Sequence, residues 1–170
     1  MDLRRYIRDV PDFPKPGILF KDITPLLRSP QALEYTITAL AEPFRSERIT
    51  SVAAIESRGF IFGSCVARML GAGFVPIRKP GKLPWTKRRN EYILEYGTDV
   101  LEIHDDAVAE NDRVLLVDDV LATGGTAAAA CYLIRDCRAT LVGAAMVIEL
   151  AFLEGRKKLD GVAVHTLIQY

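Results

Sequence analysis

Two adjacent carboxylates, Asp118 and Asp119, stand at the end of a short apolar run and directly before a loop rich in glycine and threonine. The run Val114–Val117 consists of branched residues, which is typical of a strand buried on both faces. The loop Ala122–Thr126 carries two glycines and two threonines, and the alanines at 127–130 begin a predicted helix. This order of strand, acidic pair, loop and helix predicts a site for a sugar phosphate.

The loop suits a phosphate because the first turn of a helix has unpaired backbone N–H groups and a partial positive charge. Gly124 and Gly125 allow an anion to approach the backbone closely, and Thr123 and Thr126 add hydroxyl donors. Carboxylates repel phosphate, but they accept hydrogen bonds from ribose hydroxyls and stabilise positive charge on a ribose ring. The predicted ligand is therefore a phosphorylated ribose, with its phosphate at the loop and its hydroxyls at the aspartates.

Other phosphate-binding loops fit less well. A Walker A loop needs Gly-Lys-Ser/Thr, whereas Gly125 is followed by Thr126. A dinucleotide fingerprint needs three glycines in a set spacing, and only two are present. An ordinary strand-to-helix turn capped by threonine is the remaining alternative, and the buried strand and acidic pair before the loop disfavour it.

Composition narrows the class of protein. The 170 residues suit one domain, and the 22 basic and 22 acidic side chains balance, so we expect no general attraction to nucleic acid or membrane. No apolar stretch approaches a membrane span or a signal core. Cys65, Cys131 and Cys137 show no disulfide spacing, which favours reduced thiols in a cytoplasmic protein. His104 and His165 lie far apart, and we expect no metal held by protein ligands alone.

The predicted elements alternate along a core that covers residues 29–170. Four prolines around Gly17 make residues 1–28 a rigid, loop-rich segment without a long helix. Ser29 and Pro30 begin a helix that runs to about Arg45. Further strands are predicted at 51–55, 73–77, 113–118, 140–148 and 161–167, and further helices at 60–70 and 126–137. This alternation predicts an α/β fold, a mostly parallel sheet flanked by helices.

The alternation breaks between Ile77 and Arg113. Residues 79–90 are polar, basic and irregular, and short strands are predicted at 92–95 and 100–104, joined by a hairpin turn at 97–99. Long loops within compact domains are usually functional or disordered. We therefore expect a mobile β-hairpin lid at about 79–103.

Over nearly its full length the chain resembles the adenine phosphoribosyltransferases. The acidic pair with its loop is typical of phosphoribosyltransferases broadly, and its combination with the N-terminal segment and Leu94-Glu95-Tyr96-Gly97 is specific to the adenine enzymes. The matching segments are 13–25, 56–63, 78–84, 94–97, 117–126, 148–150 and 155–159.

The resemblance implies the type I phosphoribosyltransferase fold, a parallel core sheet with a small N-terminal hood. It implies transfer of phosphoribose from 5-phospho-α-D-ribose 1-diphosphate to N9 of adenine, a purine salvage reaction that gives AMP and pyrophosphate. It also implies Mg2+ bound mainly through the substrate, and a homodimer.

The same resemblance assigns roles to residues. Arg58, Lys79 and Lys82 would neutralise pyrophosphate, and a cis peptide is expected at Ser57-Arg58. The ribose and its 5′-phosphate would contact Asp118, Asp119, Ala122, Thr123, Gly124, Gly125 and Thr126.

The adenine base would be held by the hood and by one core residue. Phe20 would stack on the purine between Leu19 and Lys21, with Val120 on the opposite face. Many members of the family carry Arg where this chain has Lys21.

The lid would bring Glu95 over the site to accept a proton from N7 of adenine as N9 attacks C1′. Arg58, Asp118 and Asp119 complete the expected catalytic set. The segment 85–90 is more basic than the lids of the family. Two alternatives stay open: a phosphoribosyltransferase for another purine, and a non-catalytic regulator that senses phosphoribosyl pyrophosphate.

Overall fold

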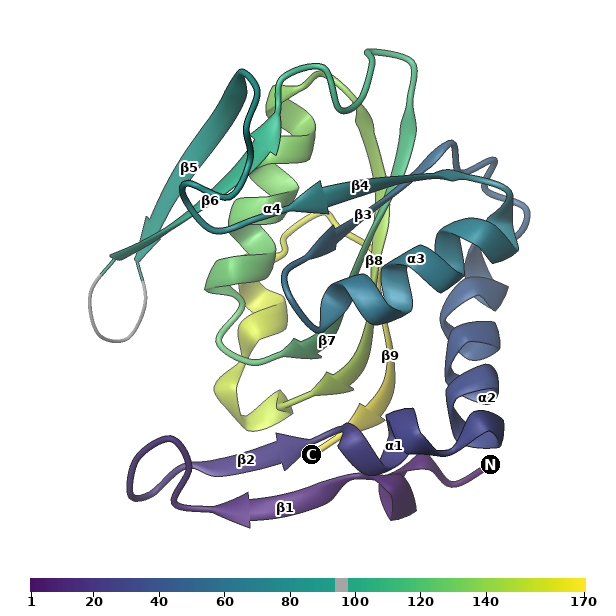
Figure 1. The fold of residues 1–170 in the computed structure, drawn as a ribbon, viewed down its shortest axis with the longest axis vertical. Helices are drawn as coiled ribbons and strands as arrows, with labels where there is room; N and C mark the ends of the chain where they lie inside the picture. The colour runs from purple at the N-terminus through teal and green to yellow at the C-terminus, as the bar shows by residue number, and fades with distance from the viewer. Residues whose placement is uncertain (94–97) are drawn as a thin grey trace.

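The computed structural model describes residues 1–93 and 98–170. Five parallel strands form its central sheet in the order β4-β3-β7-β8-β9 (Figure 1). Their bounds are β3 Ser51–Ile55, β4 Gly73–Ile77, β7 Arg113–Leu121, β8 Thr140–Glu149 and β9 Val164–Gln169. The predicted α/β fold with a parallel sheet is confirmed.

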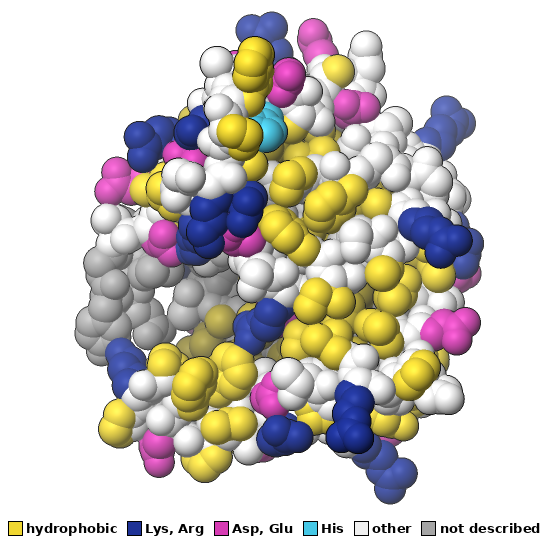
Figure 2. All heavy atoms as spheres, in the orientation of Figure 1, with side chains coloured by type: hydrophobic (Ala, Val, Ile, Leu, Met, Phe, Trp, Pro, Cys, Tyr) yellow, Lys and Arg dark blue, Asp and Glu magenta, His cyan; other side chains and the backbone are white. Residues whose placement is uncertain are grey.

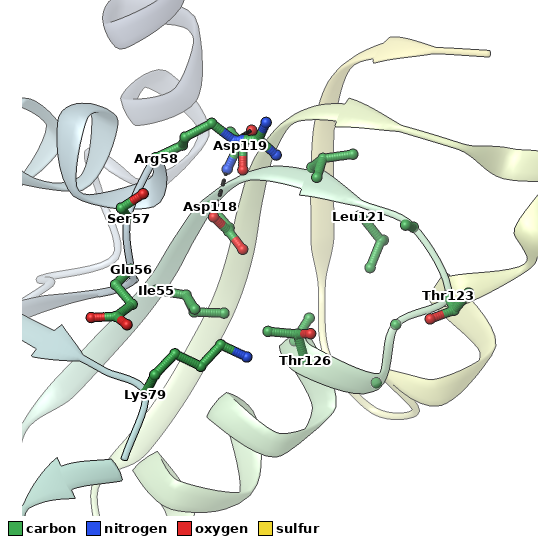
Figure 3. A pocket seen from close by; sticks show the side chains of 15 residues that line it. Ile55, Glu56, Ser57, Arg58, Lys79, Asp118, Asp119, Leu121, Thr123 and Thr126 are labelled. Atoms are coloured by element: carbon green, nitrogen blue, oxygen red, sulfur yellow. Dashed lines mark hydrogen bonds and ion pairs between the residues drawn. The ribbon is translucent and has the colours of Figure 1, made fainter. Parts of the chain in front are cut away.

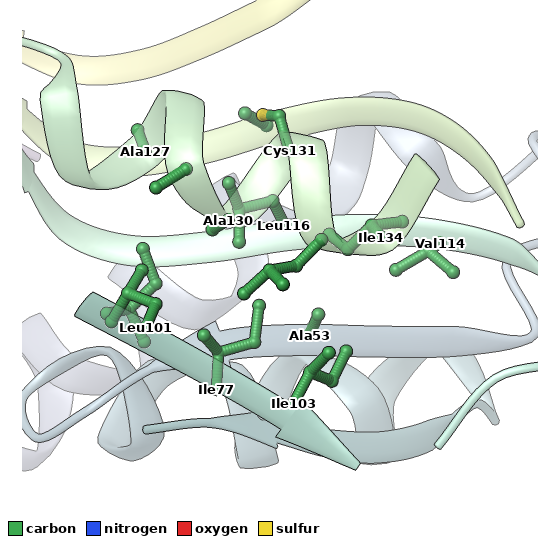
Figure 4. Close-up of a cluster of buried hydrophobic side chains, with 14 of the residues drawn as sticks. Ala53, Ile77, Leu101, Ile103, Val114, Leu116, Ala127, Ala130, Cys131 and Ile134 are labelled. Atoms are coloured by element: carbon green, nitrogen blue, oxygen red, sulfur yellow. The ribbon is translucent and has the colours of Figure 1, made fainter. Parts of the chain in front are cut away.

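Helices cover both faces of this sheet. Helix α4 (Gly125–Asp136) lies on one face, and α2 (Pro30–Ala41) and α3 (Gly59–Leu70) lie on the other (Figure 1). The alternation along β7 explains this, because Val114 and Leu116 pack with α4 while Leu115 and Val117 pack with α2 and α3. Figure 4 shows the cluster on the α4 side, where small alanines let the helix approach the strands closely.

The predicted element boundaries hold with small shifts. The Ser29 hydroxyl accepts a hydrogen bond from the Ala32 N–H at 3.3 Å, so α2 begins as expected, but it gives way to a 3-10 turn at Glu42–Phe44. Strand β7 continues three residues beyond its predicted end, because Val120 and Leu121 still pair with β8. Asp118, predicted as the last residue of the strand, and Asp119, predicted to follow it, therefore both lie within the strand.

The first 28 residues form a hood without a long helix, as predicted. It contains a 3-10 turn at Leu3–Tyr6, the antiparallel strands β1 (Arg8–Pro11) and β2 (Leu19–Asp22), and the short helix α1 (Thr24–Arg28). The Arg4 guanidinium donates to the Gln169 carbonyl at 2.8 Å, which ties the hood to the end of β9. Figure 1 shows the β1–β2 hairpin lying across the carboxyl ends of the core strands.

The segment expected to form the lid is more regular than predicted. Strands β5 (Lys87–Ile93) and β6 (Thr98–His104) pair antiparallel, so the prediction of an irregular segment up to residue 90 was wrong. Thr98 and Asp99, expected in the turn, belong to β6. The strand was hidden because its residues are polar and basic, and Arg88 among them pairs with Asp136 of α4 at 2.9 Å. No helix among the described residues is long and apolar enough to cross a membrane.

Candidate active site

A cavity of about 470 Å³ opens at the carboxyl ends of β3, β4 and β7. Figure 3 shows Lys79, Asp118 and Thr126 pointing into it from three different segments. The predicted site residues that line it are Arg58, Lys79, Asp118, Asp119, Val120, Ala122, Thr123, Gly124, Gly125 and Thr126. Leu19, Phe20, Lys21 and Lys82 are not among its lining residues, and Glu95 lies outside the described part of the chain.

The loop Ala122–Thr126, called the phosphate loop below, leads into the first turn of α4. Gly124 stands at the N-cap with a φ of 79°, a conformation that favours glycine. A Cβ on Gly124 would lie 2.2 Å from the Gly155 carbonyl oxygen, so the backbone there has no room for a side chain. The first turn of the helix and the two threonines lie on the cavity wall, an arrangement suited to binding an anion.

The acidic pair is held by two different sets of contacts. The Arg58 guanidinium pairs with the Asp119 carboxylate at 2.6 Å, and the Asp119 N–H donates to the Asp118 carboxylate at 2.9 Å. A Cβ on Gly59 would lie 2.7 Å from Asp118 Oδ1, so the start of α3 leaves room for this carboxylate. Burial raises the pKa of both carboxyls, the charge of Asp119 raises that of Asp118 further, and Arg58 opposes the rise for Asp119.

A second carboxylate, Glu56, organises the basic side of the cavity. Its buried side chain accepts hydrogen bonds from Lys82 Nζ at 2.6 Å and from Arg78 Nε at 2.8 Å. Burial opposes the charge on Glu56, but these two hydrogen bonds outweigh burial and lower its pKa. Sequence reasoning missed Glu56 and Arg78, although each one directly follows a strand of the parallel sheet, which is the position where ligands gather in such sheets.

The ammonium of Lys79 connects the cavity to the β5–β6 hairpin. It pairs with the Asp99 carboxylate and donates to the Tyr92 hydroxyl at 3.1 Å. The Thr126 hydroxyl also donates to the Tyr92 hydroxyl, at 3.2 Å. Burial disfavours the charge on Lys79, but the hydrogen bond to Asp99 outweighs burial and raises its pKa. Tyr92 and Asp99 were not predicted as site residues.

Comparison with known proteins identifies the family to which this chain belongs. A family model described as phosphoribosyl transferase domain matches residues 23–167. The adenine phosphoribosyltransferase of Acaryochloris marina is 57% identical over the full length of both chains, and that of Cyanothece sp. is 59% identical, also over both full lengths. This chain belongs to the adenine phosphoribosyltransferase family.

Solved adenine phosphoribosyltransferases have the same fold. The crystal structure from Thermoanaerobacter pseudethanolicus superposes with a TM-score of 0.96 at 50% identity and covers 99% of this chain and 98% of its own. The Saccharomyces cerevisiae enzyme, complexed with an imino-altritol bisphosphate and adenine, superposes at 0.92 with 43% identity and covers 98% and 96%. The type I phosphoribosyltransferase fold expected from the resemblance is confirmed.

The hood residues expected of an adenine phosphoribosyltransferase are separated in this chain. The Phe20 ring lies 5.1 Å from the Arg58 guanidinium, so Phe20 reaches the edge of the cavity. The ammonium of Lys21 instead pairs with Asp9 at 2.7 Å and lies 3.7 Å from the centroid of the Tyr170 ring. Leu19 is largely exposed. Phe20 therefore contacts a residue that lines the cavity, whereas the ion pair of Lys21 is made within the hood.

The cis peptide bond expected from this family falls one bond earlier than predicted. It joins Glu56 to Ser57 rather than Ser57 to Arg58. The chain turns directly after β3, where the Glu56 N–H still donates to the Ile77 carbonyl at 2.9 Å. Ser57 and Arg58 then lead into the first turn of α3.

Proposed function

We propose that this protein transfers phosphoribose from 5-phospho-α-D-ribose 1-diphosphate to N9 of adenine and releases AMP and pyrophosphate. The observation that carries the proposal is one cavity lined by two carboxylates, Asp118 and Asp119, by two cations, Arg58 and Lys79, and by the first turn of a helix. Such a cavity suits a ribose with a phosphate group at each end. The base assignment is supported by the two relatives described above, which are named for adenine, and by the yeast enzyme crystallised with adenine.

The phosphate loop binds the 5′-phosphate. Backbone N–H groups of the first turn of α4 and the hydroxyls of Thr123 and Thr126 donate to the phosphate oxygens. Asp118 and Asp119 accept hydrogen bonds from the ribose hydroxyls. Because these carboxylates belong to the strand that leads into the loop, the distance between the two subsites is fixed by β7 itself.

The pyrophosphate lies beside the cations that follow β3 and β4. Arg58, Lys79 and Lys82 neutralise it, and each of these cations already has a carboxylate partner, Asp119, Asp99 and Glu56 respectively. These carboxylates hold the cations in place before substrate arrives, so little side-chain order has to be gained on binding.

The reaction then develops positive charge at C1′ as its bond to the pyrophosphate oxygen lengthens. Asp118 and Asp119 stabilise that charge, while Arg58 and Lys79 stabilise the charge on the leaving group. The lone pair of adenine N9 forms the new bond to C1′. Glu95 accepts the proton from N7, and it is the one member of the expected catalytic set that lies outside the described residues.

The carboxylates also fit a magnesium ion that arrives with the substrate. Mg2+ prefers oxygen ligands and keeps several waters, and Asp118 and Asp119 offer carboxylate oxygens on the cavity wall. They would contact the hydrated ion while pyrophosphate and ribose oxygens supply most of its ligands. When bound, Mg2+ would neutralise part of the charge of the leaving pyrophosphate.

The base site lies between the hood and the end of β7. Phe20 stacks on one face of adenine and Val120 packs on the other, with the backbone of Leu19 and Lys21 reading the edge of the ring. The contact between Phe20 and Arg58 supports this placement, because it brings the hood ring to the edge of the cavity that holds the ribose. Stacking of a base on an aromatic ring is worth roughly 1–3 kcal/mol.

The protein functions as a cytoplasmic homodimer. Apolar side chains support the dimer, since Ile61 of α3 and Phe74 of β4 are each 38% exposed. Figure 2 shows hydrophobic side chains gathered over this region, which a second copy would cover. All three cysteines are free, which suits a reducing compartment.

The test is AMP formation from adenine, phosphoribosyl pyrophosphate and Mg2+, with hypoxanthine and guanine assayed in parallel. We expect product from adenine alone. If product formed from an oxo-purine instead, the assignment of the sugar-phosphate site would stand and the assignment of the base would be wrong. Binding of phosphoribosyl pyrophosphate without product from any base would favour the regulator instead of the enzyme.

A further inference from the structure

A second turn packs against the phosphate loop, and none of its residues lines the cavity. It follows β8 and consists of the 3-10 segments Ala151–Leu153 and Gly155–Lys158. A Cβ on Gly155 would lie 2.0 Å from the Ala122 carbonyl oxygen and 2.8 Å from the Gly124 nitrogen. The backbones of Gly155 and of the phosphate loop are therefore in direct contact, and a shift of either one displaces the other.

The position of Gly155 is fixed by the next residue, Arg156. Its guanidinium donates two hydrogen bonds to the Glu149 carboxylate, at 2.9 and 2.6 Å, and a third to the Val164 carbonyl at 2.8 Å. Because the guanidinium is planar and its three acceptors lie in different directions, these hydrogen bonds fix the orientation of the Arg156 side chain. A single contact from a lysine ammonium would not fix it.

Glu149 connects this turn to the central sheet. It is the last residue of β8, pairs in register with Leu121 of β7, and is 5% exposed. Its carboxylate also accepts hydrogen bonds from the Thr166 hydroxyl at 3.0 Å and from the Gln169 amide at 2.9 Å. The carboxylate thus has partners from the turn and from β9, and the phosphate loop and the turn both start from neighbouring strands of one sheet.

We propose that Glu149 and Arg156 are positioning residues for the 5′-phosphate: their ion pair holds Gly155 against the phosphate loop and so sets where the loop N–H groups lie relative to Asp118 and Asp119. The inference rests on the proposed function, because it assigns the 5′-phosphate to this loop. Neither side chain lines the cavity, so both act through the backbone of Gly155.

A neighbouring ion pair in the same turn offers a matched comparison. Lys157 pairs with Glu154 at 2.6 Å, but these side chains are 72% and 63% exposed, and their contact stays within the turn. Exposed pairs of this kind contribute little to stability or geometry. Lys157 therefore has the same charge as Arg156 and is its neighbour in sequence, but its ion pair does not connect the turn to the sheet.

The test compares Arg156→Lys with Lys157→Ala in the full chain. Arg156→Lys keeps the charge but cannot make the paired hydrogen bonds to Glu149. We expect its KM for phosphoribosyl pyrophosphate and its Kd for ribose 5-phosphate, measured by calorimetry, to rise by roughly ten- to a hundredfold, because small displacements of binding groups have effects of that size. KM for adenine at saturating phosphoribosyl pyrophosphate should stay within about twofold, and Lys157→Ala should match the wild type throughout.

The pattern of constants separates positioning from a merely structural role. Loss of folded protein lowers kcat and leaves both KM values unchanged, whereas a displaced loop raises only the constants for the sugar phosphate. If Arg156→Lys does not fold, Glu149→Gln is used instead, because it removes the charge of the other partner while keeping its shape. The same rise in KM for phosphoribosyl pyrophosphate and in Kd for ribose 5-phosphate is expected.

Wild-type KM and Kd in whichever of these variants folds would overturn the inference. The wild-type protein is assayed in the same series, so the proposed function is tested separately. A wild-type chain that neither forms AMP nor binds ribose 5-phosphate would overturn the proposed function itself.

Discussion

Asp118 and Asp119 are neighbours in sequence, yet their side chains have different surroundings. Asp119 is paired with the Arg58 guanidinium, which favours its ionised form. Asp118 contacts a backbone N–H and faces the Asp119 charge, so burial and repulsion both favour its protonated form. In the proposed reaction Asp118 is ionised, and this ionised form is therefore held at the expense of folding stability.

Asp118→Asn tests this opposition of stability and activity. The folded pKa of Asp118 is raised, so the stability from its protonated form is complete below the unfolded pKa of about 3.8 and is lost as pH rises through the folded pKa. A neutral isostere avoids that loss, so we expect the melting temperature at pH 8 to equal or exceed the wild-type value. Activity should fall by about a hundredfold or more, because charge stabilisation at C1′ is removed.

The measurements are thermal unfolding at pH 6 and pH 8 and the steady-state rate of AMP formation. Asp160→Asn, at an exposed position that does not line the cavity, serves as the control. It should change neither the melting temperature nor the rate of AMP formation. A melting temperature that fell in parallel with activity would show that Asp118 contributes to folding rather than to the reaction.

At the scale of elements, the phosphate loop and the turn at Gly155 act as one packed unit. Gly124→Ala would place a methyl group 2.2 Å from a backbone oxygen, which has no flexible side chain to move aside. We expect ribose 5-phosphate affinity to fall by roughly ten- to a hundredfold, since the loop must shift. The free energy of unfolding should fall by about 1–3 kcal/mol from the left-handed backbone and the clash together.

Gly71→Ala is the matched control for Gly124→Ala. Gly71 also has a positive φ, 68°, but a Cβ there meets nothing within 4 Å. Its cost in stability, about 1 kcal/mol, therefore isolates the backbone conformation from the clash. Calorimetry with ribose 5-phosphate should show wild-type affinity for Gly71→Ala, and equal losses in both variants would contradict the packing argument.

The β5–β6 hairpin contacts the site through the Tyr92 hydroxyl. This hydroxyl donates to Asp99 at 3.2 Å and accepts hydrogen bonds from Lys79 and Thr126, two residues assigned to the substrate phosphates. Tyr92→Phe keeps the buried ring and removes the acceptor that Thr126 and Lys79 share, while Lys79 keeps its pair with Asp99. We expect affinity for phosphoribosyl pyrophosphate to rise by about two- to tenfold, as the loss of one competing hydrogen bond of about 1 kcal/mol allows.

Equilibrium binding of phosphoribosyl pyrophosphate measures this effect directly. Tyr132→Phe, which removes an exposed hydroxyl from α4, is the control and should leave the affinity unchanged. A weaker affinity in Tyr92→Phe would mean that the hydroxyl supports the substrate rather than competing with it.

These elements also show which parts of the site could be predicted from the sequence and which could not. The apolar run, acidic pair and glycine loop were predictable because their chemistry lies in consecutive residues of one strand and one turn. The pairing of Glu56 with Arg78 and Lys82 was not, because it depends on where β3 and β4 end relative to each other in the folded sheet. The role of Tyr92 depends likewise on the docking of the hairpin against α4.

At the scale of the whole molecule, the candidate site and the contacts that support it both lie at the carboxyl ends of the sheet strands. Each face of the sheet packs its own apolar cluster, one with α4 and the hairpin and one with α2 and α3. The carboxyl ends of the strands therefore hold buried charges, among them Glu56, Asp119 and Glu149. Since these charges are paired only in the folded state, the stability of the whole domain depends on pH.

Glu149 makes the stability of the domain depend on pH in the acid range. The Arg156 guanidinium and the hydrogen bonds from Gln169 and Thr166 outweigh burial and lower its pKa from 4.5 to about 2. A depressed folded pKa gives stability that is present above the unfolded pKa and is lost as pH falls through the folded one. The shift corresponds to a contribution on the order of 3 kcal/mol at neutral pH.

Glu149→Gln should therefore be less stable than the wild type by about that amount at pH 7, and the difference should narrow only between pH 4.5 and pH 2. Urea unfolding at pH 7, 5, 3.5 and 2.5 measures it, and other carboxylates cancel because they titrate alike in both proteins. Glu154→Gln, which breaks the exposed pair with Lys157, should stay within about 0.5 kcal/mol of the wild type at every pH. A difference that stays constant from pH 7 to pH 2.5 would mean that Glu149 stabilises the domain through its shape and not through its charge.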